Sequence, residues 1–216
     1  MNPDRVQQLL ESVGAVRHGH FVLSSGRHSA TYVQCALVLA YPEHAETLGR
    51  DLAERFSDTK IDVVVSLALG GLILGHEVAR ALGVRALFVE RDSDGRMALR
   101  RQFQIEPKQR VLVIEDVWTT GKSTREAIDV VNAAGGRVAA LGALVDRSGG
   151  KLGWEVPAHA LLEISIPNYE SDDCPHCRAG ELAVRPGSRF EQPPAPVPGG
   201  GPRKAPDSGD RPLRRH

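Results

Sequence analysis

The residues best suited to chemistry lie in one short stretch, VLVIEDVWTTGKST, at positions 111–124. Glu115 and Asp116 end an apolar run, where carboxylates shielded from water need hydroxyl donors or a cation as partners. Residues 119–123 then offer hydroxyls, small side chains and backbone N–H groups where a helix begins, which is a ready anion site. Carboxylates for sugar hydroxyls beside amides for a phosphate indicate a site for a phosphorylated ribose.

The stretch 111–124 allows two other interpretations. A helix cap followed by surface acids would explain each of these residues taken alone, but not their combination. The sequence Gly-Lys-Ser at 121–123 also ends a nucleotide-triphosphate loop, but the GxxxxGK[ST] pattern needs glycine at the position of Asp116. The triphosphate loop is therefore excluded.

The elements that must position this stretch alternate along the chain. Four apolar runs rich in Val, Leu and Ile predict strands buried on both faces, at 61–68, 84–90, 110–116 and 137–146. Helical patterns follow Pro3 and Pro42 and occupy 72–82 and 123–134. This β-α-β rhythm predicts an α/β fold with a mostly parallel central sheet flanked by helices, whose ligands bind beyond the carboxyl ends of the strands.

Composition limits the classes of function. Lys plus Arg and Asp plus Glu number 27 each, so no basic field indicates nucleic acid or a membrane surface as a partner. The absence of a long apolar stretch or signal-like N-terminus predicts a cytoplasmic protein. We expect one domain over 1–191 and a disordered Pro/Gly-rich tail over 192–216, because the tail has almost no apolar side chains to bury.

The three cysteines are Cys35 and the CPHC pair Cys174 and Cys177. A structural zinc site needs four ligands, and no second cysteine pair has suitable spacing. A metal here would need His176 and further ligands, so we expect a turn with two free thiols and no protein-held metal.

The stretch at 111–124 resembles the ribose-phosphate signature of the type I phosphoribosyltransferases: four apolar residues, two acids and a TTG-like loop. The resemblance implies that fold, with a small hood built from about 1–40 and 150–190. It implies that the acids hold the ribose hydroxyls of phosphoribosyl pyrophosphate and the loop holds its 5′-phosphate. The segment SLALGG matches the family's pyrophosphate loop, which has a non-proline cis peptide, here at Ala68-Leu69. The donor-binding residues implied are Glu115, Asp116, Val117, Trp118, Thr119, Thr120, Gly121, Lys122, Ser123, Ala68, Leu69 and Gly70.

Two further segments are similar to orotate phosphoribosyltransferases. FVLSSGRHSATYVQC at 21–35 matches the F-x-L-x-SG-x-x-S pattern that lines the base pocket in those enzymes. LVDRSGG at 144–150 matches the element whose arginine pairs with the orotate carboxylate. The orotate-binding residues implied are Arg147, Thr119, Ser25, Gly26, Arg27, His28, Ser29 and Tyr32.

Several positions depart from the family pattern. Ser24 and Gly70 stand where many members have lysine, and Trp118 replaces a smaller apolar residue. The segment 90–106, matching the mobile catalytic loop, offers arginines in place of the usual Lys and His: Arg91, Arg96, Arg100 and Arg101. Arginine stabilises pyrophosphate charge but cannot donate a proton at neutral pH.

The resemblance implies transfer of the ribosyl 5-phosphate group to orotate, with Mg²⁺ bound mainly through the substrate and a homodimer whose loops reach the partner's site. The catalytic residues implied are Glu115, Asp116, Arg91 and Arg96. Alternatives are transfer to a purine or another base, or a regulator that senses phosphoribosyl pyrophosphate without catalysis. A purine has no carboxylate for Arg147, and the residues before the first motif are too few for a helix-turn-helix domain.

Overall fold

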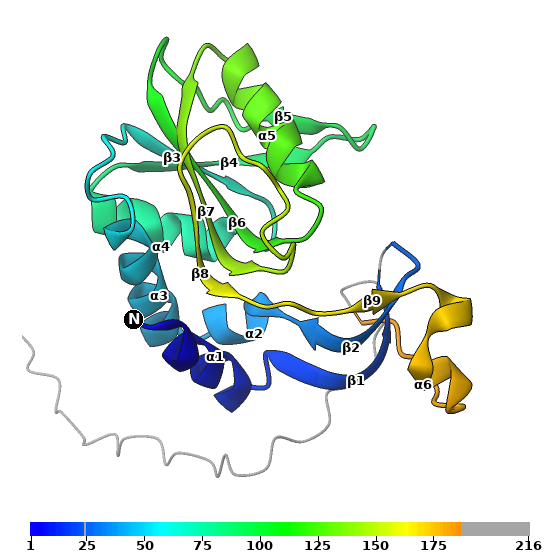
Figure 1. Cartoon of the computed structure of the whole chain (residues 1–216). Coiled ribbons are helices and arrows are strands. Elements are labelled where there is room, and N and C mark those ends of the chain that lie inside the picture. Colours follow the sequence, from blue (N-terminus) through cyan, green and yellow to red (C-terminus); the bar gives the residue numbers. More distant parts are fainter. Residues whose placement is uncertain (24, 187–216) are drawn as a thin grey trace, which may run out of the picture.

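The computed structural model describes residues 1–23 and 25–186 of the chain (Figure 1). Ser24 and the predicted tail at 192–216 lie outside these residues. The larger of two sheets has the strand order β5-β4-β3-β6-β7-β8. Its strands are β3 (Val63–Leu67), β4 (Arg85–Arg91), β5 (Met97–Leu99), β6 (Arg110–Trp118), β7 (Arg137–Asp146) and β8 (Ala158–Glu163).

All neighbours in this sheet pair in parallel except β5, which runs antiparallel to β4 at the edge. The predicted α/β class and the four predicted strands are confirmed. The two strands not anticipated, β5 and β8, are the outermost on each side.

Helices cover both faces of this sheet (Figure 1). They are α3 (Pro42–Glu54), α4 (Leu72–Leu82) and α5 (Lys122–Ala133). Alternate strand residues point to opposite faces. Val64 and Ile114 therefore pack in one core cluster with α3 and α4, and Val65 and Val113 pack with α5 in the other. None of the described helices is both long and apolar enough to cross a membrane.

The order of the strands fixes where a ligand can enter. The chain leaves β3 through α4 to reach β4 on one side, and leaves β6 through α5 to reach β7 on the other. β3 and β6 are therefore the neighbours at which the direction of winding reverses. In open α/β sheets the crevice for ligands lies beyond the carboxyl ends of such a pair, and these ends lead into the segments 68–71 and 119–121.

A smaller sheet has the order β1-β2-β9 and is antiparallel. Its strands are β1 (Val16–Val22), β2 (His28–Val33) and β9 (Asn168–Tyr169), and the nearby helices are α1 (Pro3–Ser12), α2 (Cys35–Leu39), η1 (Ser171–Asp173) and α6 (Pro175–Arg178). The helix predicted after Pro3 is present, with Asn2 Oδ1 accepting a hydrogen bond from the Arg5 N–H at 3.0 Å. Segments from both ends of the described chain thus form this sheet, as expected for a hood, whose domain boundaries stay a prediction.

Candidate active site

The acid pair lies at the carboxyl end of β6. Both carboxylates are largely shielded from water, and Glu115 accepts a hydrogen bond from the Thr124 hydroxyl in the first turn of α5. Burial raises the pKa of Glu115 to about 7, and the neighbouring Asp116 charge adds to this effect. Burial also raises the pKa of Asp116, partly offset by backbone N–H groups. Two such carboxylates are suited to accept hydrogen bonds from ligand hydroxyls.

The loop after the acids leads into α5 through Gly121. Gly121 has a left-handed φ of 71°, and no side chain caps the helix N-terminus. The Lys122 N–H makes only a long, exposed contact with Thr120 Oγ1 at 3.4 Å, so the N-terminus of α5 is suited to an anion. A Cβ at Gly121 would lie 2.7 Å from the Trp154 ring, so a glycine is required by both backbone angle and space.

Trp118, which stands where the family pattern has a smaller apolar residue, is buried near this loop at 2% exposure. Its ring lies 5.5 Å from that of Trp154, and the Arg125 guanidinium lies 4.7 Å from the Trp154 ring. Arg125 also donates to the Leu152 carbonyl at 2.5 Å. Trp154, from the segment that follows β7, thus packs on Trp118 at the end of β6 and close to Gly121, and the Trp118 side chain serves as a structural support of the loop.

The loop after β3 approaches the acid pair closely. The peptide bond Ala68-Leu69 is cis, as predicted. A Cβ on Gly70 would lie 2.4 Å from a carboxylate oxygen of Asp116. Gly70 is thus the residue type that lets the two loops meet, and a lysine in its place would collide with Asp116 in this arrangement.

Arg147 directly follows β7, the strand that pairs with β6. Its N–H donates to the Trp118 carbonyl at 2.8 Å, and its buried Nε has no hydrogen-bond partner within the described residues. Burial lowers the pKa of Arg147. The pKa of Tyr32 is raised by burial and by the charge of Asp116, and lowered in part by Arg147. A half-buried cation with an unpaired donor, close to the Tyr32 phenol, is a candidate clamp for an anionic ligand group.

Residues of the hood segment 21–35 differ in how close they lie to the acid pair. The end of β2 leads to Cys35, whose thiol lies 3.9 Å from the Asp116 carbonyl oxygen. Ser25, Gly26 and Arg27 form an exposed turn, and Arg27 pairs with Glu170 at 3.0 Å. Tyr32 is therefore the candidate that the structure brings to the acid pair.

Two of the predicted base-pocket residues make contacts elsewhere. Ser29 is buried and donates to the Thr31 carbonyl at 2.9 Å. The His28 ring is buried with its Nδ1 2.7 Å from Nε2 of His20. His28 therefore belongs to a second cluster of side chains.

The arginines of the segment 90–106 lie on the β4-β5 hairpin and its exit, exposed to solvent. Each forms an ion pair with a nearby carboxylate in this conformation: Arg91 with Glu126 at 2.7 Å, Arg96 with Asp92 at 3.3 Å and Asp94 at 2.5 Å, Arg100 with Glu90 at 3.8 Å, and Arg101 with Glu90 at 2.9 Å. The Glu126 contact holds the hairpin against α5. The structure does not bring Arg91 or Arg96 onto the acid pair.

The second cluster lies in the hood and was missed from the sequence. His20, His28, Cys174 and Cys177 have potential ligand atoms that all lie within 4.8 Å of one another. His20 and His28 come from the distant β1-β2 hairpin, and their place beside the CPHC pair was not anticipated from the sequence. The expectation of two free thiols without a protein-held metal stays a prediction, because this geometry does not test it. His176, the ligand considered from the sequence, has its Nδ1 2.7 Å from Glu181. No local spacing signals this cluster, because the histidines precede the CPHC pair by about 150 residues.

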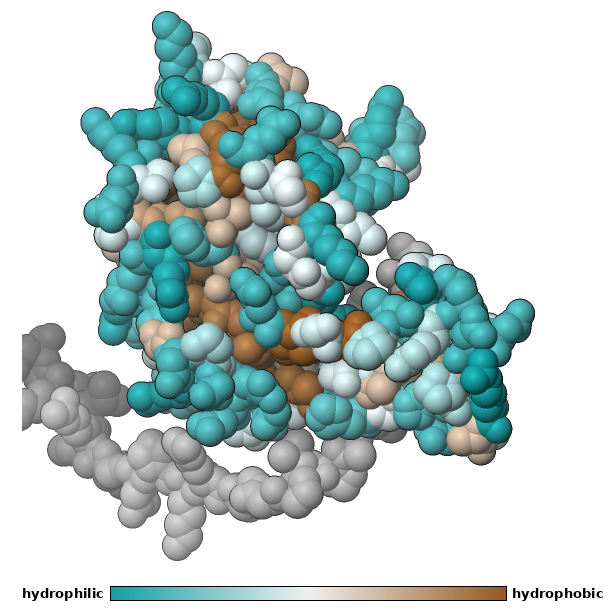
Figure 2. All heavy atoms as spheres, in the orientation of Figure 1, coloured by the Kyte–Doolittle hydropathy of each residue, from teal (hydrophilic) through white to brown (hydrophobic). Residues whose placement is uncertain are grey.

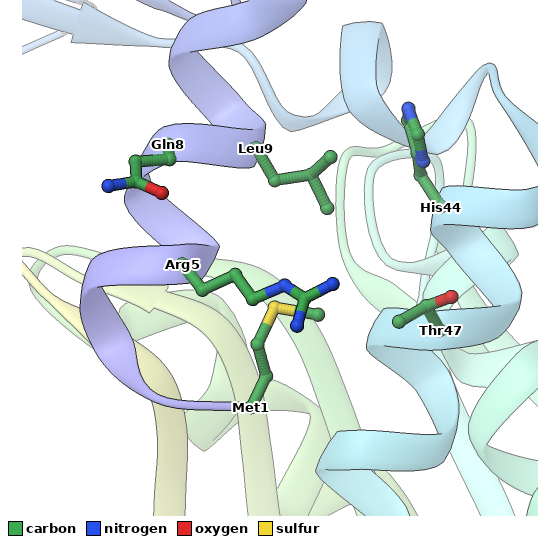
Figure 3. Close-up of a pocket in the computed structure, with 6 residues that line it drawn as sticks. All are labelled: Met1, Arg5, Gln8, Leu9, His44 and Thr47. Atoms are coloured by element: carbon green, nitrogen blue, oxygen red, sulfur yellow. The ribbon is translucent and has the colours of Figure 1, made fainter.

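A pocket of about 310 Å³ lies away from these residues, between α1 and α3 (Figure 3). Its lining combines Arg5, Gln8, His44 and Thr47 with Met1 and Leu9. None of the residues singled out from the sequence for chemistry lines it.

Comparison with known proteins agrees with this geometry. The family model of the phosphoribosyl transferase domain matches residues 39–176, and the chain belongs to this family. An orotate phosphoribosyltransferase from Caldanaerobacter subterraneus subsp. tengcongensis is 48% identical, covering 88% of this chain and 99% of its own length. One from Pelotomaculum thermopropionicum is 52% identical with the same coverage. The crystal structure of orotate phosphoribosyltransferase from Aeropyrum pernix superposes with a TM-score of 0.61 at 29% identity, covering 74% of this chain and 93% of that one.

Proposed function

We propose that this protein transfers the ribosyl 5-phosphate group from phosphoribosyl pyrophosphate to N1 of orotate, giving orotidine 5′-monophosphate and pyrophosphate in pyrimidine biosynthesis. The orotate phosphoribosyltransferases similar to it along nearly their whole length support this. The observation that carries the choice of acceptor is Arg147, a half-buried cation that follows the strand paired with β6 and whose Nε is unpaired within the described residues. Orotate has a carboxylate that such a cation binds, and a neutral base does not.

We assign the donor to the two loops that follow β3 and β6, the neighbouring strands at which the direction of winding reverses. We assign the ribose hydroxyls to Glu115 and Asp116, and the 5′-phosphate to the loop 119–123 and the N-terminus of α5. The cis peptide loop at 68–70 is assigned to the pyrophosphate. Close contact between Gly70 and Asp116 supports one continuous donor site across both loops. Val117 and Trp118 contribute backbone groups.

The acceptor lies on the hood side of the acid pair. We assign the orotate carboxylate to Arg147 and the faces of the pyrimidine to Thr119 and Tyr32, with Ser25 and Gly26 in the turn above. The effect of Asp116 and Arg147 on the pKa of Tyr32 supports a shared site for these three residues. His28 is not carried into this pocket, because its Nδ1 faces His20 and Cys177.

The reaction breaks the bond from C1′ to the pyrophosphate oxygen and forms the bond from C1′ to N1 of orotate, which loses its proton. Positive charge builds on the ribose as negative charge builds on pyrophosphate, as in other glycosyl transfers. The chain contributes by holding donor and acceptor in line and by shielding them from water. The donor set also fits Mg²⁺, because adjacent carboxylates are hard oxygen ligands. Mg²⁺ bound with the donor supplies charge neutralisation at the leaving group.

The β4-β5 hairpin and its exit, which carry the arginines of the segment 90–106, are assigned to the active site of a partner subunit in a homodimer. The tip of the hairpin is exposed and hydrophilic (Figure 2), and Arg96 at the tip makes surface ion pairs with Asp92 and Asp94 that are worth little in stability. Leu69 is 83% exposed and Ile73 is 46% exposed, so apolar side chains near the donor loop remain available for a subunit contact.

Mixing two inactive variants tests the shared site. A chain with Arg91, Arg96, Arg100 and Arg101 changed to alanine, mixed with an Arg147→Ala chain, should regain activity as hybrid dimers form. No recovery in a mixture that light scattering shows to be dimeric would reject the assignment.

We place the reaction in the cytoplasm, where thiols stay reduced. The three cysteines are free in the structure, which agrees with a reducing compartment.

A panel of acceptors tests the function. Purified protein with phosphoribosyl pyrophosphate and Mg²⁺ should release pyrophosphate with orotate, and far more slowly with uracil, adenine or hypoxanthine. Uracil is the matched control, because it is orotate without the carboxylate. Equal rates with uracil and orotate would show that Arg147 does not bind the orotate carboxylate. Turnover of a purine alone would make a purine the acceptor. Binding of the donor without turnover of any base would favour a regulator.

A further inference from the structure

The four side chains of His20, His28, Cys174 and Cys177, here called the Cys2His2 cluster, converge at the end of the hood farthest from α1. Nε2 of His20 lies 2.7 Å from Nδ1 of His28. The Cys174 sulfur lies 3.5 Å from His20 Nε2, and the Cys177 sulfur lies 3.6 Å from it and 3.3 Å from His28 Nδ1. Both thiols are free.

We propose that the Cys2His2 cluster binds a structural Zn²⁺ ion. Two sulfurs and two imidazole nitrogens are a ligand set that Zn²⁺ takes in tetrahedral geometry. With Zn–N near 2.0–2.1 Å and Zn–S near 2.3 Å, tetrahedral ligand atoms lie roughly 3.3–3.8 Å apart. Three of the four sulfur–nitrogen distances are 3.3–3.6 Å and fall in this range, and all ligand atoms lie within 4.8 Å of one another. The two nitrogens lie at hydrogen-bonding distance and separate by about 0.6 Å to admit the ion.

Hydrogen bonding around the cluster orients a ligand for the metal. Nδ1 of His20 lies 2.9 Å from the Glu181 carbonyl oxygen. A carbonyl only accepts hydrogen bonds, so Nδ1 donates and Nε2 keeps its lone pair toward the other three side chains. Metal-bound histidines are held by such an outer partner as a rule. His28 binds through Nδ1 once its proton moves to Nε2, as metal binding displaces protons from ligands.

The surroundings of the cluster favour a structural ion over a catalytic one. His20, His28 and Cys174 are buried, at 5%, 8% and 0% exposure. Four protein ligands leave no open position for water or substrate, which distinguishes a structural zinc site from a catalytic one.

The segment 171–186 gives an independent reason for a cross-link. Within it Cys174 is the only buried residue, so this segment has no apolar core of its own. Its backbone joins the hood through Val184, whose N–H donates to the His20 carbonyl at 2.8 Å and whose carbonyl accepts from Val22 at 2.9 Å. Small units that cannot bury enough apolar surface depend on metals or disulfides for order. A zinc ion would tie this segment to β1 and β2.

The same ion would act on the acid-pair side of the hood through β2. His28 begins β2 and Tyr32 lies four residues further along the same strand. A fixed β2 keeps Tyr32 in place beside Asp116 and Arg147, so zinc would order the acceptor side of the active site without contacting it.

Metal analysis of the untagged full chain, purified in reductant without chelator, tests the proposal. Mass spectrometry of the metal content should find about one zinc per chain. Cys177→Ser and His20→Asn should each lower zinc affinity by more than about 100-fold, because loss of outer-shell partners alone costs about 10–100-fold. The matched controls are His18→Asn, an exposed histidine on the same strand as His20, and His76→Asn, an exposed histidine of α4. Both controls should keep the zinc of the wild type.

A measurement on the wild type avoids variants that fail to fold. Modifying the thiols with a mercurial should release the zinc into a colorimetric indicator, and Co²⁺ exchanged into the site should give the visible bands of a tetrahedral sulfur-ligated ion. Wild-type protein that neither contains zinc nor takes it up from solution would overturn the proposal. So would a Cys174–Cys177 disulfide in the freshly purified reduced protein, or ligand variants that hold as much zinc as the two controls.

Discussion

Replacing Glu115 by glutamine separates the stability of the free protein from its affinity for the donor. Burial and the Asp116 charge raise the pKa of Glu115 from its ordinary 4.5 to about 7. The folded state therefore holds this proton more tightly than the unfolded chain, and the resulting stabilisation is complete below pH 4.5 and is lost as the pH rises through 7. Ionising Glu115 in the folded protein then costs at most about 3 kcal/mol.

Glutamine cannot ionise, and its amide oxygen can still accept from the Thr124 hydroxyl. Glu115→Gln should therefore come within about 1 kcal/mol of the wild type near pH 5 and exceed its free energy of unfolding at pH 8, by up to about 3 kcal/mol, or roughly 6–12 °C in Tm. Urea unfolding of the ligand-free proteins at intervals from pH 5 to pH 8 measures this. The control Glu54→Gln removes an exposed carboxylate of α3 and should leave the pH profile unchanged.

The same variant should bind the donor more weakly. A charged hydrogen bond is worth about 1.5–3 kcal/mol, so we expect a Kd for phosphoribosyl pyrophosphate raised roughly 10- to 150-fold by calorimetry. A stability difference between Glu115→Gln and wild type that is the same at pH 5 and pH 8 would refute the burial argument. Unchanged donor affinity would refute the assignment of Glu115 to the ribose.

Three further predictions concern neighbouring features. Gly70→Ala should raise the Kd for phosphoribosyl pyrophosphate more than tenfold while the fold persists, because its Cβ would lie 2.4 Å from Asp116; unchanged calorimetric binding would contradict this. Gly121→Ala should lower stability by about 1–3 kcal/mol in urea, from its φ of 71° and the contact with Trp154; Gly149→Ala, with similar φ but open space, is the control for the contact and should lose less. Removing zinc with a chelator should lower Tm and raise the KM for orotate more than that for the donor; an unaltered Tm would speak against a structural ion.

Local sequence patterns predicted much of the fold and the donor site. The apolar runs gave the four central strands, because a strand buried on both faces is apolar at every position. The acid pair and the following loop were recognisable because β6, its turn and α5 are contiguous in sequence. The position of the cis peptide followed from the family resemblance, and the structure confirmed it at Ala68-Leu69.

Features that depend on distant contacts were missed. The edge strands β5 and β8 are short or only partly buried, so their apolar signal is weak. The tryptophan at position 118 is explained by its packing against Trp154, a contact between residues distant in sequence. The pairing of β1 with β2 brings His20 near His28. Cys174 is far from both in sequence and reaches them because Val184, in the same C-terminal segment, is hydrogen-bonded to β1. Clusters of this kind depend on tertiary contacts that periodicity and spacing do not encode.

The most direct test of the account follows orotate by absorbance in the presence of phosphoribosyl pyrophosphate, with and without Mg²⁺. Wild type should consume orotate only with the metal, and Arg147→Ala should lower kcat/KM more than about 30-fold, since an unpaired buried carboxylate costs about 2–5 kcal/mol. Arg137→Ala, at the opposite end of β7 and exposed, should keep wild-type activity. Orotate consumption that persists in Arg147→Ala, or its absence in the wild type, would contradict the account.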